Sequence, residues 1–125
     1  MLATKRAKEL IQTGNFKNVD ADAVYIGVIP QSEITRTDRT IILITDVRTD
    51  LALDGNLDFH ALDKEVEVQI FYALNADDPD EFETSLIHLF VRNGWTMLDN
   101  HGHTVDPKTY QVTQTYYFDY YELEK

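Results

Sequence analysis

The chain has 125 residues, of which 43% are hydrophobic and 26% are charged, a composition that suits one compact domain and not a disordered chain. It has no cysteine, which excludes disulfide scaffolds, cysteine zinc sites and thiol nucleophiles. The formal net charge of −11 at pH 7 argues against a surface that grips nucleic-acid phosphates. We therefore expect one domain over residues 1–125 without a nucleic-acid-binding patch.

The first predicted element is a short amphipathic helix from Ala3 to Thr13, with Gly14 as the expected stop. Its apolar residues repeat at i, i+4, i+7 and i+8, which places them on one helix face. They are Ala3, Ala7, Leu10 and Ile11. Charged residues interrupt this segment, and no run of about 18 apolar residues occurs, so we expect no signal peptide, no membrane contact and a soluble cytoplasmic protein.

Two β-rich segments follow this helix. Val24–Ile29 ends at Pro30, and Thr40–Val47 is rich in β-branched residues, so both predict strands. The polar segment Gln31–Arg39 between them predicts a loop. Arg48–Asp63 shows no clean period, and we interpret it as a long connection or a protruding arm.

The segment Lys64–Ala73 alternates apolar and polar residues, as a strand with one buried face does. The apolar face consists of Val66, Val68, Ile70 and Tyr72, and the polar face of Glu65, Glu67 and Gln69. We expect the polar face to contact water or a polar partner. Phe71 falls on that polar face and is therefore a candidate contact residue.

The clearest predicted helix lies between Asp78 and Gly94. Asp78 is the expected cap, Pro79 suits the first turn, and Glu81 gives a spacing like that of a capping box. Apolar residues then repeat at i, i+4, i+7 and i+8, and Gly94 is the expected stop. These apolar residues are Phe82, Leu86, Leu89 and Phe90.

Two further strands, Trp95–Asp99 and Gln111–Tyr121, are predicted around a polar hairpin tip from Asn100 to Tyr110. The last strand is rich in aromatic rings, and the even-numbered rings are expected to enter the core. Tyr117 and Tyr121 then point to the other face, toward solvent, a neighbouring strand or a partner chain. Cross-strand packing and an interface with another protein both account for such rings.

The predicted order is α-β-β-β-α-β-β. Two helices with one apolar stripe each are best buried against the same face of a sheet in so small a domain. We therefore expect an α+β fold, an antiparallel sheet of about five strands with both helices packed on one face.

Candidate chemistry is confined to the hairpin tip. His101 and His103 flank Gly102, with Asp99 and Asp106 nearby, and two imidazoles with a carboxylate can bind zinc. Alternate residues of an extended strand point to opposite faces, however, and such tips are common in turns without metal. No nucleophile with a partner base and no phosphate-binding glycine loop occurs, so we expect no enzyme activity, no metal and no cofactor.

The acidic charge leaves two functional interpretations beside simple solubility. One is a protein that mimics DNA and inhibits a host nuclease, and the other is a channel wall along which DNA slides without binding.

Three stretches carry a resemblance to a known family. The stretches VQIFY, DDPDEFETSLIHLFVRNGW and GHTVDPKTYQVTQTYYF, between residues 68 and 118, resemble proteins of siphophages that infect Gram-positive bacteria. That family is often described only as an uncharacterised domain and elsewhere as tail terminator or tail completion proteins. The motifs carry no catalytic residues.

The resemblance implies a hexameric ring that caps the tail tube, ends its polymerisation and offers the docking surface for the head. Its partners would be other copies of the chain, the major tail tube protein and a head completion or connector protein, with DNA passing through the lumen. The protein would lie at the head-proximal end of the tail in the virion and in the host cytoplasm during assembly. A head-tail joining protein is the nearest alternative.

We expect the contacts of such a ring on the polar strand face, the segment 48–63 and the hairpin tip. The candidate interface residues are Glu65, Glu67, Phe71, His101, His103, Asp106, Tyr117 and Tyr121. Copies that each carry a charge of −11 repel one another, so we also expect a ring that is weaker at low salt than at high salt.

Overall fold

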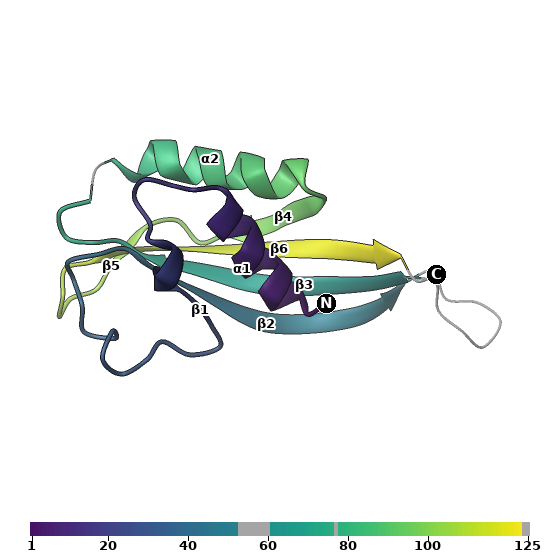
Figure 1. Ribbon diagram of the computed structural model, residues 1–125, viewed down its shortest axis with the longest axis horizontal. Coiled ribbons are helices and arrows are strands. Elements are labelled where there is room, and N and C mark those ends of the chain that lie inside the picture. The colour runs from purple at the N-terminus through teal and green to yellow at the C-terminus, as the bar shows by residue number, and fades with distance from the viewer. Residues whose placement is uncertain (53–60, 77, 124–125) are drawn as a thin grey trace.

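The computed structural model describes residues 1–52, 61–76 and 78–123. Within these ranges the chain forms one mixed sheet of six strands and two α-helices (Figure 1). The elements are α1 (Ala3–Thr13), the 3-10 turn η1 (Ala21–Ala23), β1 (Val24–Ile26), β2 (Ile41–Ala52), β3 (Ala61–Phe71), α2 (Pro79–Arg92), β4 (Trp95–Asn100), β5 (Thr104–Val105) and β6 (Val112–Leu123).

The strands lie in the order β1-β2-β3-β6-β4, and the short strand β5 pairs with β6. The predicted α+β class is confirmed, but a purely antiparallel sheet was wrong, because β1 pairs with β2 in parallel. A parallel pair needs a crossover connection of about a dozen or more residues. The segment from Gly27 to Thr40, which includes the predicted loop Gln31–Arg39, provides it.

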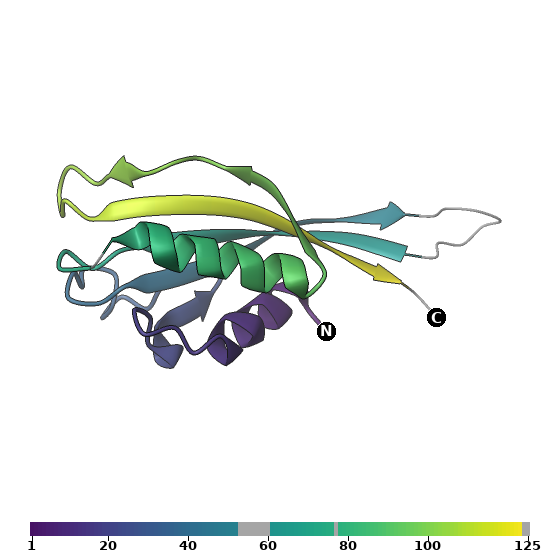
Figure 2. The ribbon, with the colours of Figure 1, turned by 90° about the horizontal axis from the view of Figure 1, so that it is seen from above.

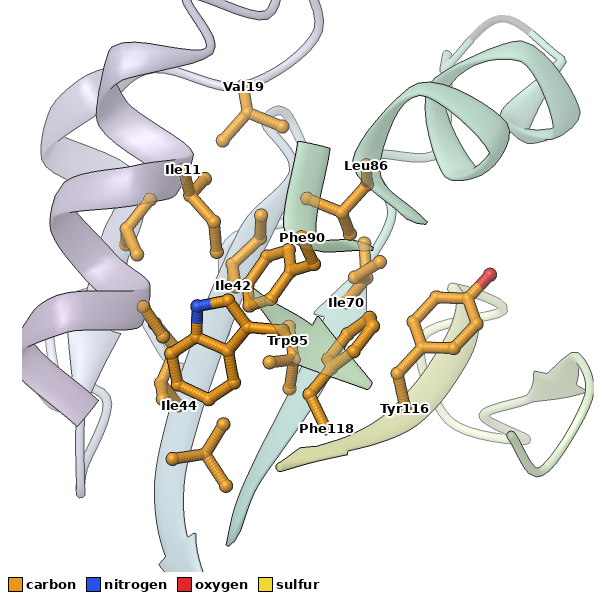
Figure 3. Close-up of a cluster of buried hydrophobic side chains, with 14 of the residues drawn as sticks. Ile11, Val19, Ile42, Ile44, Ile70, Leu86, Phe90, Trp95, Tyr116 and Phe118 are labelled. Carbon is orange, nitrogen blue, oxygen red and sulfur yellow. The ribbon is translucent and has the colours of Figure 1, made fainter. Parts of the chain in front are cut away.

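Both helices cover the same face of the sheet, as predicted (Figures 1 and 2). Alternate residues of β2, β3 and β6 point toward them and join one apolar core. Figure 3 shows Ile11 of α1 and Leu86 and Phe90 of α2 meeting the strand residues there. The fully buried strand residues include Ile42, Ile44, Val66, Val68, Ile70 and Phe118.

Aromatic rings fill the end of the core next to β4. Phe90 stacks on Phe118 with ring centres 4.2 Å apart and contacts Trp95 edge to face at 5.4 Å. The guanidinium of Arg6 lies over the ring of Tyr120, 4.4 Å from its centre. The even-numbered rings of β6 therefore face the helices, as the alternation predicted.

Helix α1 has the predicted bounds and ends at the predicted residue, Gly14, which is its C-cap. Its φ of −66° lies in the right-handed region, which any residue can adopt. A Cβ at this position would lie 2.6 Å from Phe16 Cε2 and 2.9 Å from Leu89 Cδ2. Glycine is needed here for the close approach of the chain to α2.

Helix α2 begins and ends at the predicted signals. The Asp78 side chain accepts a hydrogen bond from the Asp80 N–H at 3.0 Å, and Pro79 opens the first turn. Gly94 follows the helix with a φ of +92°, a conformation that favours glycine. None of the helices in the described ranges is long and apolar enough to cross a membrane.

Strand β1 is shorter than predicted because Gly27 turns the chain with a φ of +79°. The crossover that follows is held by Arg39. Its guanidinium lies 3.1 Å from Asp22 Oδ1 and 3.3 Å from Glu33 Oε1, and it donates to the Tyr25 hydroxyl at 3.1 Å. This network of charges fixes the loop against β1.

Strands β2 and β3 extend well beyond the predicted ends. Residues 48–52 and 61–63, predicted as part of a connection or arm, continue the β2–β3 ladder from Arg48↔Glu65 to Ala52↔Ala61. The remaining part of the predicted arm, 53–60, lies outside the described residues. Figure 2 shows the ends of β2, β3 and β6 running past both helices, and we call this extension the blade.

Candidate functional site

The candidate site is the side of the sheet that faces away from α1 and α2. We call it the open face, and it consists of side chains at alternate positions on neighbouring strands, as the strand registers show. The residues are Leu43, Thr45, Arg48 and Asp50 of β2, Asp63, Glu65, Glu67, Gln69 and Phe71 of β3, Thr113, Thr115, Tyr117, Asp119 and Tyr121 of β6, and Thr96 and Asp99 of β4.

The open face has a neutral end and an acidic end. At the neutral end Phe71 pairs with Ile41 and Thr113, and its ring is half-buried by these neighbours. The hairpin tip adds a shallow hollow of about 550 Å³ beside this end, lined by Gln69, residues 104–108, Thr113 and Thr115. The acidic end begins one row further and continues into the blade.

Arg48 is the one cation among the residues that define the open face. Its Nε lies 3.0 Å from Glu65 Oε1 and 3.3 Å from Asp50 Oδ2. A β-bulge after Asp46 allows this contact, because it shifts the register so that Arg48 comes to lie opposite Glu65. The bulge was not predicted, since the sequence pattern of residues 48–63 has no clear period.

Asp63 and Asp119 form no ion pair with any cation in the described part of the chain. Burial and the carboxylates of Asp63 and Glu65 raise the pKa of Asp119 to about 6, well above its ordinary value. The Oδ1 atom of Asp63 is shielded from solvent and has no hydrogen-bond partner among the described residues. The open face therefore holds more carboxylates than its own donors and cations stabilise.

Tyr117 contacts Glu67 in the next row. The Tyr117 hydroxyl donates to Glu67 Oε2 at 2.6 Å, and this hydrogen bond, with burial and nearby carboxylates, raises the pKa of Tyr117 to about 12. The phenol therefore remains a donor at neutral pH. Of the two tyrosines predicted on this face, Tyr117 is thus held by the sheet itself, whereas Tyr121 is 46% exposed.

The structure separates the two histidines of the hairpin tip. His101 faces the open side, with its Nε2 atom 3.6 Å from Asp99 Oδ2 and its ring centre 5.1 Å from that of Tyr117. His103 faces the helix layer instead. Gly102 turns the chain between them with a φ of +70°.

Asp106 has a local role in the same tip. Its Oδ1 atom accepts hydrogen bonds from the N–H groups of Lys108 at 2.8 Å and Thr109 at 3.4 Å, which closes the turn before β6. His101, His103 and Asp106 do not converge, and among the described residues no group of three or more His, Cys, Asp or Glu side chains can hold a metal ion. The turn interpretation of the tip agrees with this geometry.

A buried carboxylate on the helix side was missed by the sequence analysis. Glu83 of α2 is 7% exposed and accepts hydrogen bonds from the Tyr72 hydroxyl at 2.5 Å, the Tyr116 hydroxyl at 2.9 Å and His103 Nε2 at 2.6 Å. Figure 3 shows the Tyr116 hydroxyl pointing away from the apolar cluster. We call these four residues the Glu83 cluster.

The sequence contained a signal for this cluster. Glu83 lies next to Phe82 and three residues before Leu86, so helical spacing places it on the buried stripe. Tyr72 and Tyr116 occupy buried strand positions, and buried hydroxyls require hydrogen-bond partners. The cluster satisfies all its members and joins α2, β3, β6 and the hairpin tip.

The amino-acid sequence matches one known protein family. The family model described as a protein of unknown function (DUF806) matches residues 2–121. No curated protein matches the chain.

Proposed function

This chain belongs to the DUF806 family, and from that premise we propose that it is a tail terminator, a structural protein of siphophage assembly and not an enzyme. In this proposal the chain forms a ring, most simply a hexamer, that caps the tail tube, stops its polymerisation and provides the surface to which the head docks. The support from the sequence is the resemblance of its second half to such proteins.

The open face is the structural observation that carries the proposal. One face of the sheet is closed by α1 and α2, whereas no helix of the described residues covers the other. Tyrosines such as Tyr117 and Tyr121 on an uncovered sheet face are typical of contact with another protein. A ring of copies supplies such contacts without any catalytic group.

The acidic charge of the chain also suits passage of DNA. A ring whose copies each carry a net charge of −11 repels phosphates, so its lumen lets DNA slide without binding. The blade and the hairpin tip lie at opposite ends of the sheet (Figure 2), where they can reach the tail tube on one side of a ring and the head connector on the other.

Electron microscopy of tails made by a phage with a stop codon in this gene tests the proposal. We expect tubes that are too long or ragged at the head end and that carry no filled heads. Plasmid expression of the chain should restore tails of normal length. Normal tails that are joined to heads in the mutant phage would overturn the proposal.

Two other results would point to the alternatives. Tails of normal length that lack heads would indicate a head-tail joining protein. The open-face carboxylates also give the DNA-mimic alternative a specific surface, and a host nuclease captured by the chain in a salt-sensitive manner would favour that function.

A further inference from the structure

Four of the 11 lysines and arginines of this acidic chain lie within its first 17 residues. Lys5, Arg6, Lys8 and Lys17 lie on or just after α1, and Glu9 is the one acidic residue before Asp20. Arg6 lies 3.8 Å from Glu122, whereas Lys5 and Lys8 form no ion pair with any of the described residues. The outer side of α1 is therefore basic and has cations available for a partner.

This basic side lies opposite the open face. Helix α1 packs on the helix side of β1, β2 and β3 through Ala3, Ala7 and Ile11, which directs Lys5 and Lys8 away from the sheet. The acidic end of the open face lies on the far side of the same strands. One copy thus presents an acidic surface and a basic surface on its two sides.

The acidic end lacks the cations that the basic side offers. Arg48 neutralises part of the charge of Glu65 and Asp50, and His101 lies 3.6 Å from Asp99. Glu67 and the pair Asp63 and Asp119, in contrast, have no lysine or arginine of the described chain within ion-pair distance. The raised pKa of Asp119 agrees with this shortage of positive charge. Ammonium groups from another molecule would supply the missing positive charge.

Exposed apolar groups accompany the charges on both surfaces. Leu2, at the start of α1, is 73% exposed, and Tyr121 and Leu123 of the blade are 46% and 63% exposed. Both surfaces therefore combine apolar side chains with charges of opposite sign, as complementary surfaces do.

We propose that the acidic end of the open face of one copy binds the basic outer side of α1 of the next copy. Such an interface joins two different patches, so it repeats head to tail and closes into a ring when the rotation between copies allows it. This inference rests on the proposed ring and identifies the surfaces that build it. Salt screens both this attraction and the overall repulsion between copies, so exchange of charges tests the interface more directly than salt does.

Two charge-reversed variants test the interface. Glu67→Lys with Asp99→Lys places two lysines on the open face where it is proposed to meet the lysines of α1, and Lys5→Glu with Lys8→Glu places two glutamates on α1. In sedimentation velocity we expect each variant to associate at least about tenfold more weakly than the wild-type chain, because like charges then meet. An equimolar mixture of the two should regain association, since opposite charges then meet again at every contact.

A matched control separates this effect from a change of net charge. Asp80→Lys with Glu81→Lys alters the charge by the same amount as the open-face variant, at exposed positions at the start of α2. We expect wild-type association for this control. Equal weakening of the control and the open-face variant, or no regain in the mixture, would overturn the inference.

Cross-linking detects the contact where association is weak. The chain has no cysteine, so Lys5→Cys with Glu67→Cys introduces the only thiols. A short bismaleimide should convert this variant into a ladder of oligomers, and each single variant into dimers at most. Dimers alone from the double variant would indicate a two-fold interface and contradict the head-to-tail contact.

Complementation of the stop-codon phage separates the two proposals. Wild-type expression that restores tails, together with failure of each charge-reversed variant alone and success of both together, supports the interface. Restoration by each variant alone would overturn the interface and leave the terminator function standing. Normal tails without any complementation would contradict the terminator function itself.

Discussion

Carboxylates have opposite environments on the two sides of the sheet. On the helix side, Glu83 is buried and receives hydrogen bonds from Tyr72, Tyr116 and His103. On the open side, Asp63 and Asp119 lie close together without an ion pair to any described residue, and Asp119 has a raised pKa. The first arrangement is complete within the chain, whereas the second lacks the positive charge that a partner can provide.

The difference separates a structural role from a binding role. A buried carboxylate with a full set of donors stabilises the native chain and leaves no group free for a partner. Half-buried carboxylates that repel one another lower the stability of the isolated chain and gain most when a cation approaches. The contrast leads to four predictions, given from the largest expected effect to the smallest.

Glu83→Ala should lower the free energy of unfolding by about 3 kcal/mol, because the buried hydroxyls of Tyr72 and Tyr116 lose their acceptor. Urea unfolding followed by circular dichroism measures the change. Glu81→Ala, on the exposed side of the same helix, is the matched control and should change the stability by less than about 0.5 kcal/mol. Equal effects of the two substitutions would contradict the structural role of the Glu83 cluster.

His103→Ala should lower the free energy of unfolding by about 1.5 kcal/mol, since the imidazole donates to a buried carboxylate but is itself 45% exposed. His101→Ala is the matched control, because His101 lies two residues away on the open side. We expect its effect on urea unfolding to be close to zero. A larger loss of stability with His101→Ala than with His103→Ala would contradict the assignment of His103 to the Glu83 cluster and of His101 to the open side.

Asp119→Asn should raise the stability of the isolated chain at pH 7 by about 1 kcal/mol, a value reduced for the partial solvent exposure of this group. Because the folded pKa of about 6 lies above the ordinary value, the folded state binds the proton more tightly than the unfolded state does. The wild-type chain therefore loses stability as pH rises from about 4 to about 6.

The difference between Asp119→Asn and the wild type should accordingly shrink toward zero when unfolding is measured near pH 4. The comparison cancels the titration of the other carboxyl groups, which the two chains share. A difference that is constant with pH would show that Asp119 is not stabilised in its protonated form.

Tyr117→Phe should lower the stability by about 0.5 kcal/mol, the smallest effect, because Glu67 keeps its access to water when the hydroxyl is removed. Tyr116→Phe removes a tyrosine hydroxyl from the Glu83 cluster. It should lower the free energy of unfolding by about twice as much or more, since the acceptor of this hydroxyl is buried. If urea unfolding shows equal losses of stability for the two variants, the carboxylates on the two sides of the sheet do not differ in their need for a donor.

Much of the local structure was predicted from the sequence. Both helices were located because Ala3–Thr13 and Pro79–Arg92 have a helical apolar period, and α2 also has clear end signals. The alternation along β3 predicted which side of the sheet is buried, and β6 followed the same rule. These features depend on neighbours a few residues apart, which a sequence displays directly.

The predictions failed where distant segments meet. The parallel pairing of β1 with β2 and the bulge that aligns Arg48 with Glu65 depend on register and loop path. The Glu83 cluster likewise combines residues from α2, β3, β6 and the hairpin tip. The periodic pattern of a short segment does not predict contacts between residues far apart in the chain.

The sequence by itself therefore determined the two helices, the buried stripe of each main strand and the acidic character of the chain, because side-chain periodicity and charge are properties of short segments. Only the tertiary structure decided which carboxylates receive donors and which lack a cation, and that α1 presents its lysines opposite the open face. These relations arise when pairing between strands fixes distances between residues far apart in the chain, and the free energy of a charged group depends on those distances.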